Sequence, residues 1–286
     1  MALKEEAYKN LKNFSKVGEY LGERGHYYRF LYRALRFSGQ YPWFSLDERL
    51  EEVVKSFEAF LENNKTFTNN YPTGVKEKVK NLKDGKETEN SVEDLFADDV
   101  WQKSVEGKKI CDKFGEKIYR QLPVGLFYEE KKENKAVFTG GSSAIDLWTC
   151  DEDSITVFEL KLTPNKKVGI ISELFFYCNY MRDMYGEGEK IAQSHFKPHI
   201  VDKKRIKKKE KYRGYYNICS GKFKKINGCM LYDEGNLHQA ITEDVLKEMN
   251  SAEFVENETP ISYGLVEYTV ENRKLKIGEI KGFMKN

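Results

Sequence analysis

The stretch AIDLWTCDEDSITVFELKL, residues 144–162, contains two strand-like runs separated by a short acidic turn. The runs 144–150 and 155–162 are rich in the β-branched, aromatic and aliphatic residues that favour strands. The four residues between them, 151–154, are polar and suit a hairpin loop. The stretch therefore predicts a β-hairpin, and the apolar density of its second run predicts that this strand is largely buried.

The four-residue loop fixes the register that we expect for the hairpin. It places Cys150 opposite Ile155, and the same register places Asp146 opposite Glu159. Directly opposed side chains have Cβ atoms about 4.5–5.5 Å apart. Lys161 lies two residues after Glu159 and projects from the same face of the strand. The hairpin is thus expected to gather two carboxylates and one ammonium group on one patch of sheet.

Two carboxylates side by side on a buried strand repel each other, which raises one pKa unless a cation lies between them. A divalent metal replaces this repulsion by coordination, and ligation by oxygen alone suits Mg²⁺ or Mn²⁺. Such a metal would polarise a phosphate and acidify a water, while Lys161 would orient that water or stabilise the developing negative charge. The alternative interpretation is an ordinary salt-bridge cluster on a solvated sheet face. The apolar character of residues 155–162 disfavours it.

The sequence IDLW, the acidic turn and the sequence VFELKL resemble the PD-(D/E)XK nuclease superfamily, in which an Asp ends one strand and E-x-K lies on the next. Ile145 replaces the proline of the motif, at a position that contacts no ligand. The resemblance covers residues 95–185 and implies an α/β, restriction-endonuclease-like fold with a central mixed β-sheet of four or five strands flanked by helices. It also implies a DNA-binding, Mg²⁺- or Mn²⁺-dependent nuclease with Asp146, Glu159 and Lys161 as catalytic residues and Asp146 and Glu159 as metal ligands.

Many members of the superfamily also have a glutamate on a helix before the sheet that completes the metal shell. Glu106 is our first choice for this ligand and catalytic residue, because its helix leads into the strand-like sequence YRQLPVG. Glu116 is the second choice and Glu93 the third. A solvated helix position is the alternative for Glu106.

After the lysine strand, a helix of the superfamily often carries Gln with Tyr four residues later. Glu173 and Tyr177 occupy these positions and are expected to support the site. Glu in place of Gln is a departure, so position 173 either contacts the substrate or supports residues that do. Core packing beside Phe175 and Phe176 is the simpler explanation for Tyr177.

Residues 1–90 are expected to form a helical segment before a nuclease-like domain at 91–286. The run 27–37 (YYRFLYRALRF) has apolar residues at helical spacing, and residues 45–48 (SLDE) have the form of a capping box before an apolar stripe. The Tyr and Phe content of residues 27–37 exceeds what one helix face needs for its own packing. We therefore expect this segment to help self-association, as in a homodimer, or substrate placement, and not to supply catalytic groups.

The remaining pattern predicts a helical stretch at 91–114 in two pieces, helices at 168–185 and 243–249, strands at 119–129 and 225–232, and a hairpin at 261–280. The basic segment 203–213 (KKRIKKKEKYR) has eight Lys or Arg among eleven residues. It either follows nucleic-acid phosphates or is a solvated loop. Nearby Tyr212, Tyr215 and Tyr216 favour stacking on single strands. The candidate nucleic-acid-binding residues are Lys203, Lys204, Arg205, Lys207, Lys208 and Lys209.

The bulk composition excludes several other classes of protein. The 286 residues carry a net charge of only +2, so nucleic-acid binding must come from local patches. No apolar run approaches the roughly 18–20 residues that cross a bilayer, and the polar start MALKEEAYKN does not resemble a signal peptide, which leads us to expect a cytoplasmic protein without a membrane partner. The five cysteines contain no CxxC pair, which disfavours a zinc ribbon. Pro198 disfavours a metal site made of His195 and His199.

Two further functions stay open at this point. The chain could retain the nuclease fold as a catalytically silent binding or scaffold protein. It could also be a regulatory protein whose aromatic N-terminal helices bind a partner. Metal binding separates the nuclease from both alternatives.

Overall fold

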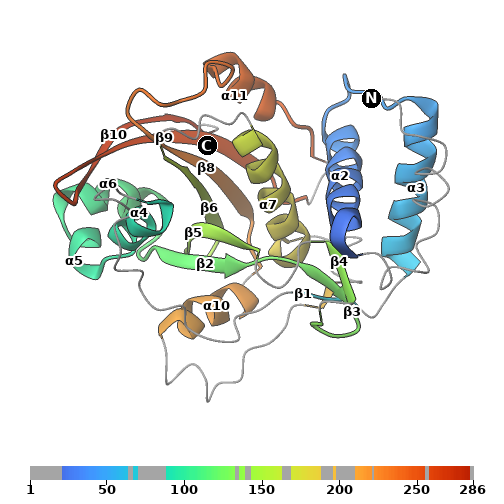
Figure 1. Cartoon of the computed structure of the whole chain (residues 1–286), viewed down its shortest axis with the longest axis horizontal. Helices are drawn as coiled ribbons and strands as arrows, with labels where there is room; N and C mark the ends of the chain where they lie inside the picture. The colour runs from blue at the N-terminus through green and yellow to red at the C-terminus, as the bar shows by residue number, and fades with distance from the viewer. Residues whose placement is uncertain are drawn as a thin grey trace.

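A computed structural model describes residues 21–63, 67–69, 88–132, 135–138, 143–162, 169–187, 196–197, 210–220, 222–254 and 258–283. Its centre is a mixed six-stranded sheet with the strand order β10-β9-β8-β6-β5-β2 (Figure 1). The expected four or five strands were therefore too few. The strands of this sheet are β2 (Tyr119–Pro123), β5 (Ala144–Cys150), β6 (Ser154–Lys161), β8 (Lys225–Asp233), β9 (Ile261–Glu271) and β10 (Lys274–Gly282).

A second, four-stranded sheet has the order β4-β3-β1-β7. Its strands are β1 (Phe67–Asn69), β3 (Leu126–Tyr128), β4 (Ala136–Phe138) and β7 (Phe196–Lys197). The single strand expected at 119–129 is divided between the two sheets, because the chain turns at Gly125, whose φ of 152° is a conformation that favours glycine.

The helices of the described chain agree with most of the predicted ones, except that residues 91–114 form three helices. Helix α3 begins after Asp47, whose side chain accepts hydrogen bonds from the amides of Arg49 and Leu50, so Asp47 and not Ser45 is the cap. No helix within the described residues combines the length and apolar character needed to span a bilayer. The helices are α2 (Leu21–Gln40), α3 (Glu48–Asn63), α4 (Glu89–Phe96), α5 (Asp99–Gln102), α6 (Val105–Phe114), α7 (Gly169–Tyr185), α10 (Glu210–Ser220) and α11 (Glu243–Met249).

The predicted register of the hairpin β5–β6 is confirmed. The two strands are antiparallel, and their pairs run from Cys150 with Ile155 to Leu147 with Phe158. β6 then pairs in parallel with β8, and β8 in parallel with β9. Parallel strands are usually covered on both faces, which explains their nearly continuous apolar sequences.

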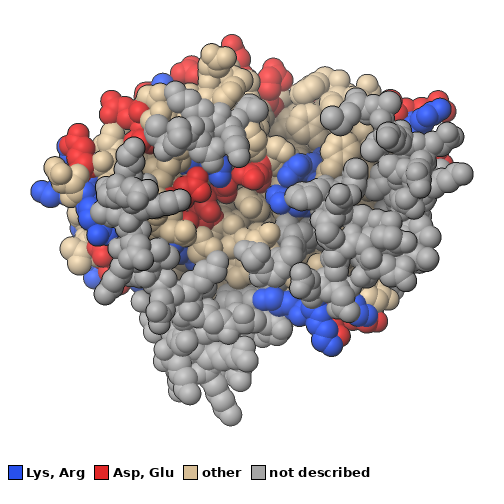
Figure 2. All heavy atoms as spheres, viewed as in Figure 1, with Lys and Arg blue, Asp and Glu red and all other residues tan. Residues whose placement is uncertain are grey.

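Helices cover both faces of the six-stranded sheet. On one face, Val92 of α4 and Ile110 of α6 belong to a buried cluster with Leu147 and Phe158. On the other face α7 packs on the sheet, and Figure 1 shows α2 and then α3 lying beyond α7. On the face of the molecule in Figure 2, acidic side chains gather near the middle, and a group of basic side chains lies beside them.

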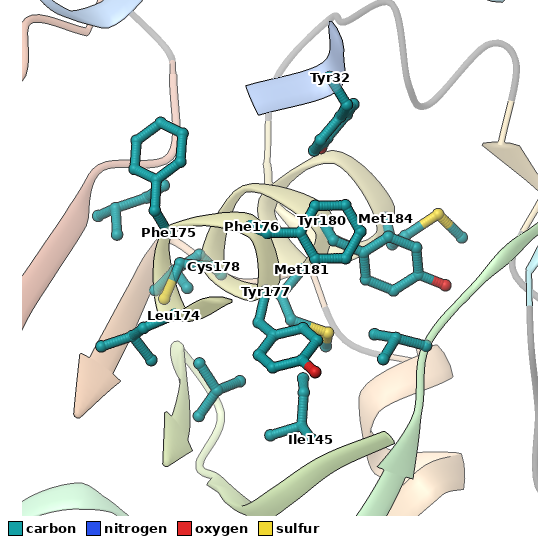
Figure 3. Close-up of a cluster of buried hydrophobic side chains, with 14 of the residues drawn as sticks. Tyr32, Ile145, Leu174, Phe175, Phe176, Tyr177, Cys178, Tyr180, Met181 and Met184 are labelled. Carbon is teal, nitrogen blue, oxygen red and sulfur yellow. The ribbon is translucent and has the colours of Figure 1, made fainter. Parts of the chain in front are cut away.

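Helix α7 lies very close to the central strand β8. A Cβ atom at Gly228 of β8 would lie 2.5 Å from the Sγ atom of Cys178, so only glycine allows this approach. On its outer side, α7 directs Phe176 towards Tyr32 of α2, and the ring centroids are 5.5 Å apart (Figure 3). Helix α7 is consequently buried between the sheet and α2.

The aromatic helix α2 packs within its own chain. Tyr28 stacks on Phe57 of α3 with ring centroids 5.8 Å apart, and Tyr28 and Tyr32 are buried. The hydroxyl of Tyr32 donates to Oδ2 of the buried Asp183 on α7 at 2.5 Å, and Arg36 forms an ion pair with the same oxygen. Phe30 is an exposed large apolar side chain on this helix. The patch expected to drive self-association is therefore mostly used inside the chain, and the homodimer stays a prediction.

The Asp183 network predicts a stability effect. Asp183→Asn leaves the buried guanidinium of Arg36 without its counter-ion, and we expect the free energy of unfolding to fall by about 3–5 kcal/mol. Asp244→Asn is the matched control, because Asp244 makes a surface pair with Lys247 and its loss should have no measurable effect. Urea denaturation measures both variants. Equal stability of the two variants would show that the network does not hold α2 on α7.

Candidate active site

Asp146 lies just beyond the last paired residues of the hairpin. The backbone pairing of β5 with β6 ends at Leu147 and Phe158, one pair before Asp146 and Glu159. The carboxylate Oδ2 of Asp146 instead accepts the amide hydrogen of Leu160 at 3.0 Å. This hydrogen bond holds the Asp146 side chain against β6, next to Glu159. Asp146 and Glu159 are called the acidic pair below.

Glu159 is the buried member of the acidic pair, with 4% of its surface exposed. Its Oε1 atom accepts a hydrogen bond from Nζ of Lys161 at 2.7 Å. Its Oε2 atom is buried and has no hydrogen-bond partner in the described part of the chain. A buried carboxylate oxygen without a partner is costly, so this atom is a candidate ligand for a cation.

The two carboxyl groups of the acidic pair share a strongly perturbed electrostatic environment. Burial raises the pKa of Asp146 from 3.8 to about 7, and the charge of Glu93 adds to the rise. Burial, and then the charge of Asp146, raise the pKa of Glu159 well above its usual range, although Lys161 opposes the shift. Without a metal, the acidic pair therefore retains a proton near neutral pH.

Lys161 provides a positive charge beside the acidic pair. Burial lowers the pKa of Lys161, but Glu159 and Glu173 outweigh burial and raise it overall. The Nζ atom of Lys161 lies 3.5 Å from Oε2 of Glu173 on α7. Lys161 is therefore protonated at neutral pH and connects β6 to α7.

The two residues expected to support the site, Glu173 and Tyr177, both lie on α7, where Glu173 is partly exposed and Tyr177 is buried. Tyr177 is 7% exposed, and Figure 3 shows its ring pointing from α7 towards Ile145 of β5. Burial, followed by the charge of Glu159, raises the pKa of the Tyr177 hydroxyl. The structure thus brings both residues close to the acidic pair, and Tyr177 also belongs to the hydrophobic core.

Glu106, our first choice for the helix glutamate, does not lie at the acidic pair. Its Oε2 atom accepts the amide hydrogen of Ile277 on β10 at 2.8 Å and also binds Lys109. β10 is one edge of the sheet and is separated from β5 by three strands. The structure therefore does not bring Glu106 to the acidic pair, because α6 packs on β10. Glu116, the second choice, is exposed beyond the end of α6.

Glu93 of α4, the third choice, is the helix glutamate that approaches the acidic pair. It is 2% exposed, and its charge raises the pKa of Asp146. Its Oε2 atom accepts hydrogen bonds from Nη2 of Arg120 at 2.9 Å and from Nε2 of Gln121 at 2.7 Å. The signal in the sequence was the position of Glu93 beside Val92, on the apolar side of a short helix.

The donors at the acidic pair fit a hard divalent cation. Mg²⁺ is usually held by one or two protein carboxylates, with waters and substrate oxygens completing the shell. Asp146 and Glu159 supply two carboxylates, and Oε2 of Glu159 is free to coordinate. Across the described residues, no group of three or more His, Cys, Asp or Glu side chains is arranged to hold a metal. A cation here would therefore depend on water and substrate for most of its ligands.

Two sequence expectations concern residues at or beyond the limits of the described chain. The hydroxyl of Tyr215 accepts a hydrogen bond from Asn69 at 3.0 Å and its ring is buried, so Tyr215 is a core residue and not a platform for bases. His195, His199 and the candidate phosphate contacts lie outside the described residues, the latter being Lys203, Lys204, Arg205, Lys207, Lys208 and Lys209.

The raised pKa values predict how the metal-free protein responds to pH. A carboxyl group whose pKa is higher in the folded than in the unfolded state stabilises the fold below about pH 4, and this contribution is lost as the pH rises to about 7. Asp146→Asn removes one ionisable member of the pair and keeps its shape. In EDTA at pH 8 we expect this variant to melt about 2–4 °C above wild type, which corresponds to about 1 kcal/mol.

The control for this prediction is Asp112→Asn, because Asp112 is exposed on α6. Asp112→Asn should have the same melting temperature as wild type at pH 8 and at pH 4.5. The difference in melting temperature between Asp146→Asn and wild type should disappear at pH 4.5, where the acidic pair is protonated. A melting temperature for Asp146→Asn that is equal to or below that of wild type at pH 8 contradicts the repulsion inferred for the pair.

The chain matches no family model, no curated protein and no solved structure. The resemblance to the PD-(D/E)XK superfamily therefore depends on residues 144–162 and on the elements around them. A function for the chain has to be inferred from the contacts of Asp146, Glu159 and Lys161.

Proposed function

We propose that the chain is a nuclease that hydrolyses phosphodiester bonds with Mg²⁺ or Mn²⁺, and that DNA is favoured over RNA as its substrate. The observation that carries this proposal is the buried Oε2 atom of Glu159, which lacks a partner among the described residues beside Asp146 and Lys161. A buried carboxylate beside a half-buried one destabilises a fold unless a cation binds them. The preference for DNA comes from the resemblance of residues 144–162 to the superfamily.

Each residue of the site has a separate role in this proposal. Asp146 and Glu159 would hold the divalent ion, which when bound supplies a Lewis acid for the phosphate and lowers the pKa of water. Lys161 keeps its positive charge at neutral pH and stabilises the negative charge that develops on the phosphate oxygens. Glu173 orients the Lys161 ammonium group from α7, and Tyr177 covers the site on the side of the core.

A catalytically silent scaffold protein is the second candidate, and one observation favours it. Lys161 already neutralises one oxygen of Glu159 at 2.7 Å without any metal. A protein of this kind would use the acidic pair and Lys161 as a fixed buried ion pair. The two functions differ in whether the acidic pair binds Mn²⁺, which titration calorimetry and electron paramagnetic resonance detect.

The nuclease proposal predicts that Asp146→Asn and Glu159→Gln each lower the cleavage rate at least about 100-fold, because each removes an anionic ligand while keeping the side-chain shape. Cleavage of labelled single-stranded DNA, duplex DNA and RNA is measured with Mg²⁺, Mn²⁺ or EDTA. Both variants should also lose Mn²⁺ binding. Asp112→Asn is again the matched control and should retain both properties.

Either of two results rejects the nuclease. One is an Asp146→Asn variant that retains full metal-dependent cleavage. The other is a wild-type protein that neither binds Mn²⁺ nor cleaves any of the three substrates, which would favour the scaffold function. Circular dichroism of each variant shows whether a loss of cleavage comes from unfolding.

A further inference from the structure

Two arginines of α2 lie against the outer side of α7, close to the acidic pair. The guanidinium carbon of Arg29 lies 4.6 Å from the centre of the Phe176 ring, and that of Arg33 lies 5.7 Å from it. Residues four apart on a helix lie on the same face, so the two cations are neighbours. Phe176 thus has two guanidinium groups beside one ring.

Neither Arg29 nor Arg33 forms an ion pair within the part of the chain that the structure describes. The Nε atom of each is buried there without a hydrogen-bond partner. Arg36, one turn further along α2, is in contrast paired with Asp183. Like charges at this spacing repel, and unsatisfied buried donors reduce stability. The positive charges and unsatisfied donors of Arg29 and Arg33 therefore suit the binding of an anion.

Tyr177 connects these arginines electrostatically to the acidic pair. The charges acting on its hydroxyl include those of Glu159 and of Arg29. Arg33 in turn interacts with Glu173 and Tyr177. Figure 2 shows a group of basic side chains between α7 and α2, next to a group of acidic side chains near the middle of the face. Opposite charges thus lie side by side on one surface.

We propose that Arg29 and Arg33 form an anion subsite that binds a phosphate group of the substrate, adjacent to the phosphate that is cleaved at the acidic pair. The proposal rests on the proposed nuclease function, and it gives the substrate placement expected of the N-terminal segment two named residues. A guanidinium group donates two parallel hydrogen bonds to a phosphate, and the face of Phe176 orients the two groups. The anion is either an internal phosphodiester or a terminal monophosphate.

Binding of an oligonucleotide tests the subsite without depending on cleavage. Fluorescence anisotropy measures the dissociation constant of a labelled twelve-residue oligothymidylate with Ca²⁺ in place of Mg²⁺, and gels confirm that the oligonucleotide stays intact. The full-length double variant Arg29→Gln/Arg33→Gln should bind at least about tenfold more weakly. Its plot of log affinity against log salt should be flatter by about 0.7, since one phosphate contact is lost and each contributes about 0.7 on single strands.

The matched control is Arg49→Gln/Arg273→Gln, which removes two positive charges from exposed positions on α3 and in the β9–β10 turn. It should bind like wild type. Oligonucleotides with a 5′-phosphate or a 5′-hydroxyl distinguish the two sources of the anion. If Arg29→Gln/Arg33→Gln loses affinity only for the 5′-phosphorylated oligonucleotide, the subsite binds a terminal monophosphate. If it loses affinity equally for both oligonucleotides, the subsite binds an internal phosphodiester.

The subsite is rejected if Arg29→Gln/Arg33→Gln binds with unchanged affinity and salt dependence, or if wild type binds neither oligonucleotide. If the variant binds like wild type but wild type still cleaves with metal, only the subsite is rejected and the nuclease function stands. Binding that needs both arginines, in a protein that never cleaves, would keep the subsite and reject the nuclease. If circular dichroism shows that the double variant does not fold, the single variants decide, and each should weaken binding at least about threefold.

Discussion

The burial of Glu159 beside Asp146 on the central sheet is the constraint on which the rest of the site depends. Glu159 lies on β6, between the parallel strand β8 and the antiparallel strand β5, so its carboxylate has little access to water. A buried carboxylate has to be protonated, paired or bound to a cation. Lys161 pairs with one oxygen, the pKa of the group rises, and Oε2 is left without a partner in the described chain.

The helices around the sheet place further charges at the acidic pair from both sides. On one side α4 contributes Glu93, which Arg120 and Gln121 hold in position. On the other side α7 contributes Glu173, which contacts Lys161. Each of these helix carboxylates contacts a cation, Arg120 for Glu93 and Lys161 for Glu173.

The local part of this arrangement could be predicted from the sequence, and the long-range part could not. The length of the acidic turn determined the register of β5 with β6, and the E-x-K spacing placed Glu159 and Lys161 on one face. The position of Glu106 depended on whether α6 packs on β5 or on β10, which no local pattern records. Arg29 and Arg33 were not recognised because their environment is created by residues about 140 positions later in the chain.

The attachment of α2 to α7 links the stability of the fold to the proposed binding of the substrate. Tyr32 and Arg36 hold α2 on α7 through Asp183, and Arg29 and Arg33 lie in the middle of the same helix. Any movement of α2 would separate the two arginines from Phe176 and would weaken the interaction of Arg29 with Tyr177. The buried Asp183 network and the two arginines, which form no ion pair within the described residues, are therefore two parts of one arrangement. The Asp183 network fixes α2 on α7. Because α2 is fixed there, Arg29 and Arg33 place positive charge near the acidic pair.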